Sequence, residues 1–197
     1  MDFVNSAILG AIQGATEFIP VSSSGHLIIV RDLLGLQIEH GLAFDAVLQL
    51  ATTLAVLVYF WKDIIGYIRN FFILLGNFCT KFFAGFVGSN KDIEEPNISK
   101  KEKTLLYAVI LGTIPAVLIG LFLEESLDTL FRNPSLVAGS LIVGGLVMWF
   151  AEKFATQAKD LSSKSGFGIG FFQALALIPG FSRSGMTISG GLFFGLK

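Results

Sequence analysis

The residues from Gln13 to His26 constrain this chain more than any other stretch, because they set polar side chains inside sequence that is otherwise apolar. Between Phe3 and Ile29, the ionisable side chains are Glu17 and His26. An ionisable group at the depth of a lipid bilayer is costly to place there and usually has a function. The stretch is therefore the first candidate for a functional site.

Pro20 predicts a break in the middle of this stretch. Proline lacks a backbone N–H and disfavours helical geometry at the residue before it, so a helix through Ile8 should end near Phe18. The serines that follow are good caps for a new helix. A break within a membrane must be buried in protein or line a watery cavity, and the new helix would point its N-terminus at an anion there. The alternative is a proline kink whose serines bond to the preceding turn, which leaves Glu17 unexplained.

Composition predicts an all-α integral membrane protein. Hydrophobic residues make up 53% of the 197 residues, charged residues 15%, and the mean hydropathy is +0.71. A soluble domain would carry about 25% charged residues. The net charge of −1 and the lack of a basic stripe argue against nucleic acid as a partner. The single cysteine, Cys79, permits neither an intrachain disulfide nor a cysteine metal site.

Four apolar segments after the broken pair have about the length of a membrane span, at residues 43–61, 71–87, 105–123 and 136–150. The polar loops at residues 88–103 and 152–164 carry most of the lysines, which predicts that both face the cytoplasm. The N-terminus has no positive charge before its apolar stretch, so we expect it to remain on the mature protein. Close helix packing is expected at the small residues Gly139, Ser140, Gly144 and Gly145.

A polar stripe interrupts the first of these segments. Asp45, Gln49 and either Thr52 or Thr53 recur at helical spacing, and polar groups inside a membrane normally face the bundle interior. The stripe would then support the pocket from behind. The alternative is that Asp45 lies at the membrane surface in contact with water.

Residues 171–185 repeat the design of the opening stretch, with an apolar helix carrying a glutamine, then Ile-Pro, then Ser-x-Ser-Gly. The serine motifs, residues 22–25 and 182–185, lie about 160 residues apart. Paired broken helices in a repeat predict tips that meet near the membrane midplane. We expect one membrane domain over residues 1–197, with broken helices at 1–36 and 167–197. An inverted repeat needs an odd number of intervening spans, so four spans leave its orientation open.

The second break adds Arg183, whose guanidinium suits bidentate binding of phosphate oxygens. Together the breaks would supply a cation, hydroxyls, a carboxylate and an imidazole, which suits phosphoryl transfer. The alternative for Arg183 is a structural pairing with Glu17. The same architecture is also found in transporters, so a transporter or flippase of a lipid phosphate or other anion is the competing function.

Two motifs bear a specific resemblance. Gln13-x-x-x-Glu17 resembles the (E/Q)xxxE motif, and the residues from Pro179 to Thr187 resemble the PGxSRSxxT motif, of the bacterial undecaprenyl-pyrophosphate phosphatases, or bacitracin-resistance proteins. Residues 21–26, 44–60 and 112–116 are also similar to that family. The resemblance implies hydrolysis of undecaprenyl diphosphate to undecaprenyl phosphate and inorganic phosphate with a divalent cation, Mg²⁺ or Ca²⁺. Family members continue through further spans, so we expect this chain to be truncated.

The resemblance and the residues together suggest roles. Glu17, aided by Gln13, would bind the metal, and Ser23 would be the nucleophile with His26 taking its proton. Attack by water with His26 as base is the competitor. The pyrophosphate would be held by Arg183 together with Ser22, Ser24, Ser182, Ser184 and Thr187. The resemblance further implies a multi-pass protein of the bacterial plasma (inner) membrane, with its site facing outside. Its partners would be a polyprenyl diphosphate substrate and membrane lipids, and whether it forms a homodimer is left open.

Overall fold

The computed structural model describes all residues except 1–2, 37–40, 88–96 and 131–132. Its regular structure is helical, apart from an isolated bridge between Lys159 and Leu196. The helices are α1 (Phe3–Glu17), α2 (Ser23–Leu33), α3 (Gly41–Tyr59), α4 (Trp61–Val87), α5 (Lys100–Leu130), α6 (Pro134–Phe154), α7 (Ser163–Leu175) and α8 (Arg183–Phe193). The prediction of an all-α chain is confirmed.

Two helical hairpins, α1–α2 and α7–α8, correspond to the two predicted broken helices. Pro20 and Pro179 lie in the breaks, and the second helix of each hairpin begins directly after a serine. The hydroxyl of Ser22 accepts from the backbone N–H of Gly25 at 3.4 Å, and Ser182 accepts from Gly185 at 3.1 Å. Each serine therefore caps the helix that follows the break, as the sequence predicts.

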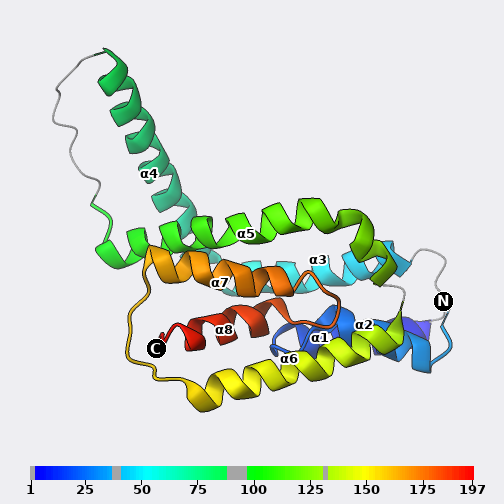
Figure 1. Cartoon of the computed structure of the whole chain (residues 1–197). Helices are drawn as coiled ribbons and strands as arrows, with labels where there is room; N and C mark the ends of the chain where they lie inside the picture. Colours follow the sequence, from blue (N-terminus) through cyan, green and yellow to red (C-terminus); the bar gives the residue numbers. More distant parts are fainter. Residues whose placement is uncertain (1–2, 37–40, 88–96, 131–132) are drawn as a thin grey trace.

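The hairpins enter the bundle from opposite ends, and their tips meet near its middle (Figure 1). A Cβ added at Gly25 would lie 3.1 Å from the Cα of Gly180. One added at Gly185 would lie 2.9 Å from the carbonyl oxygen of Pro20. Each hairpin thus presents a glycine to the backbone of the other break, which confirms that the tips face each other.

The helices between the hairpins differ from the predicted spans. Residues 100–123 of α5 and all of α6 are each long and apolar enough to cross a membrane. The helices α3 and α4 meet this test only as a pair, bent by 85° at a short break. A separate span at residues 71–87 is therefore wrong. Residues 62–70 belong to the same helix, α4, which projects away from the other helices (Figure 1). Counting the bent pair as one crossing leaves three spans between the hairpins, the odd number that an inverted repeat requires.

The helix α6 lies behind both tips and closes the junction between them. A Cβ at Gly180 would lie 2.6 Å from the carbonyl oxygen of Val137 and 2.7 Å from the Cβ of Ser140. Gly144 faces Phe181 of the second tip, so close packing at Ser140 and Gly144 is confirmed. The prediction of close packing is wrong for Gly139 and Gly145, where an added Cβ would meet no atom within 4 Å.

We predict that Gly180→Ala destabilises the protein by about 3 kcal/mol. Gly180 has φ +99°, which disfavours a residue with a Cβ, and the added methyl would collide with the backbone of α6. Chemical denaturation in detergent micelles measures the change. Gly139→Ala is the matched control, because its methyl meets open space and should leave stability equal or slightly raised. If Gly180→Ala and the wild type had the same denaturant concentration at the midpoint of unfolding, the described packing of the tips would be contradicted.

Candidate active site

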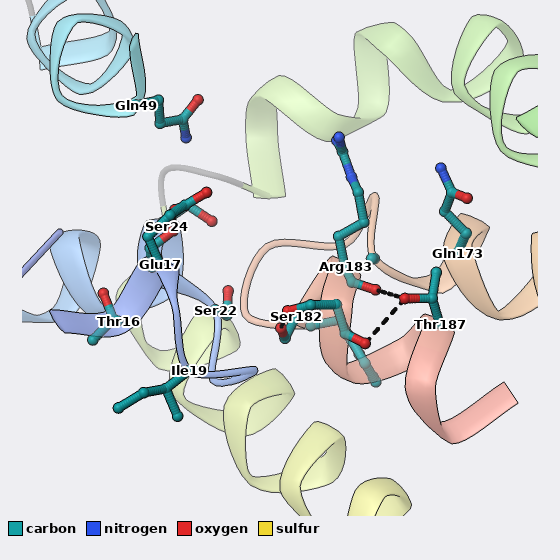
Figure 2. A pocket seen from close by; sticks show the side chains of 14 residues that line it. Thr16, Glu17, Ile19, Ser22, Ser24, Gln49, Gln173, Ser182, Arg183 and Thr187 are labelled. Carbon is teal, nitrogen blue, oxygen red and sulfur yellow. Dashed lines mark hydrogen bonds between the residues drawn. The ribbon is translucent and has the colours of Figure 1, made fainter. Parts of the chain in front are cut away.

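A cavity of about 470 Å³ opens where the two tips meet (Figure 2). Its first wall comes from the α1–α2 hairpin, a glutamine comes from α3, and its second wall comes from the α7–α8 hairpin. The lining residues are Thr16, Glu17, Ile19, Ser22, Ser23, Ser24, Gln49, Gln173, Ala176, Phe181, Ser182, Arg183, Ser184 and Thr187. Within this lining, Glu17 and Arg183 are the charged side chains, and they lie on opposite walls.

Glu17 is the last residue of α1 and receives two hydrogen bonds on one carboxylate oxygen. The hydroxyl of Ser23 donates to Oε2 at 2.5 Å, and the amide nitrogen of Gln13 donates to the same oxygen at 2.9 Å. Ser23 is the first residue of α2, so its side chain turns back across the break to reach the end of α1. The break thereby joins a hydroxyl to a carboxylate that can take its proton.

The second wall carries Arg183 at the start of α8, with an exposed side chain. Among the described residues, no ion pair joins Arg183 to Glu17, so the structural pairing is not observed. The hydroxyls of Ser182 and Ser184 lie 3.1 Å apart, and Thr187 donates to backbone carbonyl oxygens of its own helix (Figure 2). The guanidinium is therefore available to a ligand in the cavity.

The helices α2 and α8 both begin at this cavity. Their first residues, Ser23, Ser24, Arg183 and Ser184, all line it. The first N–H groups of a helix have no partner within the helix, and that end carries partial positive charge. Two helix N-termini, several hydroxyls and a guanidinium favour an anionic ligand with several oxygens, such as a phosphate.

His26 does not line this cavity, contrary to our expectation that it would share the chamber with Ser23. It lines a neighbouring, largely apolar cavity formed with α6, and its Nδ1 lies 2.9 Å from the carbonyl oxygen of Ser22. Because a carbonyl only accepts, Nδ1 carries the proton in this contact. Helical spacing placed Ser23 and His26 on one face, but the hydroxyl at the helix start points back to Glu17 instead.

The predicted metal site has one carboxylate. In the part of the chain that the structure describes, no three His, Cys, Asp or Glu side chains lie together so that they could hold a metal ion. Mg²⁺ is often bound by one or two carboxylates together with phosphate oxygens of the substrate, and Glu17 beside an anion cavity fits that pattern. Gln13 is 1% exposed and does not line the cavity, so it contacts Glu17 rather than a ligand there.

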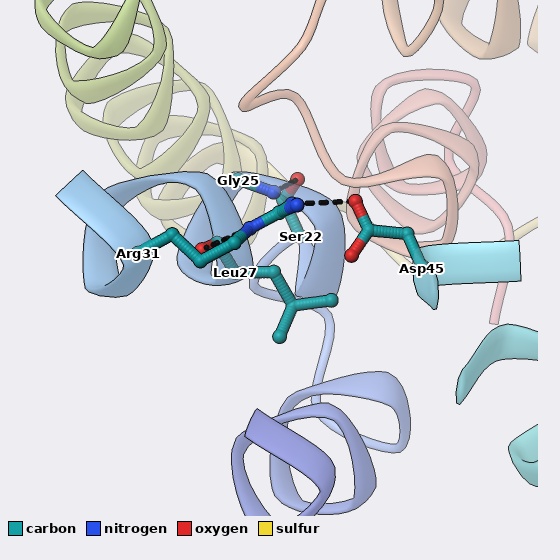
Figure 3. A network of polar contacts seen from close by, with 5 residues as sticks. All are labelled: Ser22, Gly25, Leu27, Arg31 and Asp45. Atoms are coloured by element: carbon teal, nitrogen blue, oxygen red, sulfur yellow. Dashed lines mark hydrogen bonds and ion pairs between the residues drawn. The ribbon is translucent and has the colours of Figure 1, made fainter. Parts of the chain in front are cut away.

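The polar stripe on α3 faces the bundle interior. Asp45 forms an ion pair with Arg31 of α2 at 2.5 Å, with the two side chains 19% and 14% exposed (Figure 3). Gln49 lines the cavity, and Thr52 is buried while its neighbour Thr53 is exposed. Asp45 therefore has a charged partner within the bundle, while the alternative that it lies at the membrane surface stays a prediction. Two polar residues of the lining, Thr16 and Gln173, were not predicted, although Gln173 lies 160 positions after Gln13 in the repeat.

The chain is similar to known proteins over nearly its whole length. The family model of the bacitracin resistance protein BacA matches residues 6–197. The chain belongs to the BacA family. A curated undecaprenyl-diphosphatase of Methanosphaera stadtmanae is 38% identical over 201 positions, which cover all of this chain and 69% of that protein. The BacA resemblance drawn from the two motifs is confirmed, and both motifs contribute residues to the cavity.

We predict that Arg183→Lys weakens pyrophosphate binding about tenfold. Lysine keeps the positive charge but loses the planar fork that holds two phosphate oxygens at once. Competition by inorganic pyrophosphate for the purified protein measures the affinity. Arg183→Gln should bind more weakly still, whereas Lys164→Arg, on an exposed residue outside the cavity, should change nothing. Equal affinity in the wild type and in Arg183→Lys would argue against bidentate capture.

Proposed function

We propose that this protein hydrolyses undecaprenyl diphosphate to undecaprenyl phosphate and inorganic phosphate. The observation that carries the proposal is the hydrogen bond from Ser23 to Glu17, in a cavity whose opposite wall presents Arg183. A nucleophile, a proton acceptor and a phosphate-binding cation are the parts that a phosphatase needs. Membership of the BacA family and the likeness to an undecaprenyl-diphosphatase support the same reaction.

In the proposed mechanism, the diphosphate enters with its oxygens held by Arg183 and the hydroxyls of the second tip. The oxygen of Ser23 attacks the terminal phosphorus while Glu17 takes its proton. The bond from that phosphorus to the bridging oxygen breaks, and undecaprenyl phosphate leaves. Water then releases inorganic phosphate from the serine. The competing route is direct attack by a water that Glu17 deprotonates.

The proposed cofactor is a divalent cation, Mg²⁺ or Ca²⁺. Glu17 would hold it together with phosphate oxygens of the substrate. When bound, it would neutralise charge on the transferring phosphate. Gln13, which donates to Glu17, would keep that carboxylate in place.

For the location, we propose a plasma membrane with the site reached from the outer face. The orientation of the bundle is supported by its ends, since the start of α5, the end of α6 and the start of α7 lie at one of them (Figure 1). The lysines near these ends favour the cytoplasmic side; they are Lys100, Lys101, Lys103, Lys153, Lys159 and Lys164. A homodimer stays a prediction, which the mass of the protein in detergent would check.

We predict that purified protein releases inorganic phosphate from undecaprenyl diphosphate and that Glu17→Gln reduces this rate at least a hundredfold, the lower range for loss of a general base. The amide keeps the shape of the side chain but cannot take the proton. Phosphate release is followed in detergent micelles with added Mg²⁺. Binding and transfer of the lipid across a bilayer without release of phosphate would instead favour the transporter function.

We predict that Ser23→Ala loses far more activity than Ser24→Ala. The hydroxyl of Ser23 is bonded to Glu17, whereas Ser24 lines the cavity one position further along α2. The two variants remove the same atom from adjacent residues, so each is the control for the other. Equal and mild losses in turnover would remove Ser23 as the nucleophile and leave direct attack by water.

A further inference from the structure

Gln13 is a buried amide whose side chain joins two helices. It is 1% exposed, and its nitrogen donates to Glu17 of the same helix at 2.9 Å and to the hydroxyl of Thr52 on α3 at 3.4 Å. An amide group has two N–H donors, and both are used by these two acceptors. Gln13 therefore connects the carboxylate in the cavity to a hydroxyl on a different helix.

Thr52 can only accept in this contact. Its hydroxyl donates to carbonyl oxygens of α3. The hydroxyl oxygen lies 3.0 Å from the carbonyl oxygen of Gln49 and 3.3 Å from that of Leu48. The lone pairs that remain face the amide of Gln13. If the amide oxygen faced Thr52 instead, the hydroxyl would have to give up its bonds to the carbonyl oxygens of α3 in order to donate to it, so the observed arrangement favours the nitrogen.

The oxygen of the Gln13 amide also bears on the orientation of this side chain. The oxygen Oε1 of Gln13 is buried and has no hydrogen-bond partner in the part of the chain that the structure describes. A buried acceptor without a partner is unfavourable. Turning the amide over would be worse, because Oε1 would then face the carboxylate of Glu17, which only accepts, and the hydroxyl of Thr52, whose proton is used within α3. The orientation of Gln13 is thus decided by its two acceptors.

The helix that carries Thr52 is itself held in place. Asp45 lies seven positions earlier on α3, on the same stripe, and its ion pair with Arg31 ties α3 to α2 (Figure 3). Glu17 and Ser23 lie on α1 and α2, so α3 is fixed to both helices that build the reacting pair.

We propose that Thr52 is a positioning residue for Glu17, acting through the amide of Gln13. The hydroxyl of Thr52 orients Gln13, and Gln13 holds the Oε2 oxygen of Glu17 where Ser23 donates to it. The inference rests on the proposed function only in taking Glu17 as the proton acceptor.

The test compares Thr52→Val, which replaces the hydroxyl with a methyl of similar size, with Thr52→Ser, which keeps it. Thr52→Val should lower kcat about tenfold, or about 1.4 kcal/mol, with KM unchanged, because Thr52 does not line the cavity. Thr52→Ser should restore most of the rate. Thr53→Val is the matched control, since Thr53 is the exposed neighbour. Wild-type kcat in Thr52→Val, or failure of Thr52→Ser to restore it in a folded protein, would overturn the proposal.

A double-mutant cycle separates positioning from a merely structural role. In a Gln13→Met background, Thr52→Val should lower kcat by less than about twofold, because its path to Glu17 is already cut. Full additivity of the two losses would overturn the proposal. The infrared carboxylate band of Glu17 can be assigned by difference from Glu17→Gln. This band should shift in Thr52→Val, and the measurement does not depend on whether the protein releases phosphate. A shifted band without hydrolysis would sink the proposed function alone, and an unshifted band would sink this inference.

Discussion

The fold depends on the need to satisfy the backbone where two helices are broken inside apolar surroundings. Lipid offers no hydrogen bonds, so an interrupted helix is stable there only if protein groups or a watery cavity receive its free ends. Here each break ends in a serine that caps the next helix, and each tip closes against the other through Gly25, Gly180 and Gly185. The helix α6 backs the junction, so the open side of the breaks is the polar cavity.

The two hairpins share a scaffold but contribute different chemistry. Both supply a capping serine, a helix N-terminus and a glycine for close approach. The first adds the bonded pair of Ser23 and Glu17, and the second adds Arg183 without an acidic partner among the residues described. The features that the two hairpins share therefore build the anion site. Their differences give the two walls different roles, since the first carries the reacting pair and the second carries the cation that would bind the phosphate.

Most residues that line the cavity could be predicted from the sequence, because their signals are local. A proline followed by serines predicts a break and a cap, and an arginine in such a break predicts an anion ligand, whatever the rest of the chain does. Prediction from the sequence failed for His26, where helical spacing suggested a shared face with Ser23 but the first residue of a helix can turn back toward the preceding segment. It also failed for α4, because composition marks an apolar helix without saying whether the chain bends before it.

The sequence by itself determined the membrane class, the two breaks, their caps and the residue types available at each tip. These follow from composition, from the missing N–H of proline and from the short reach of a serine cap. Only the tertiary structure decided which side chains meet: Ser23 with Glu17, Asp45 with Arg31, and Gln13 with Thr52 rather than Thr53. Such pairings depend on the packing of helices far apart in the chain, and a periodic pattern defines the face of a helix but not its partner.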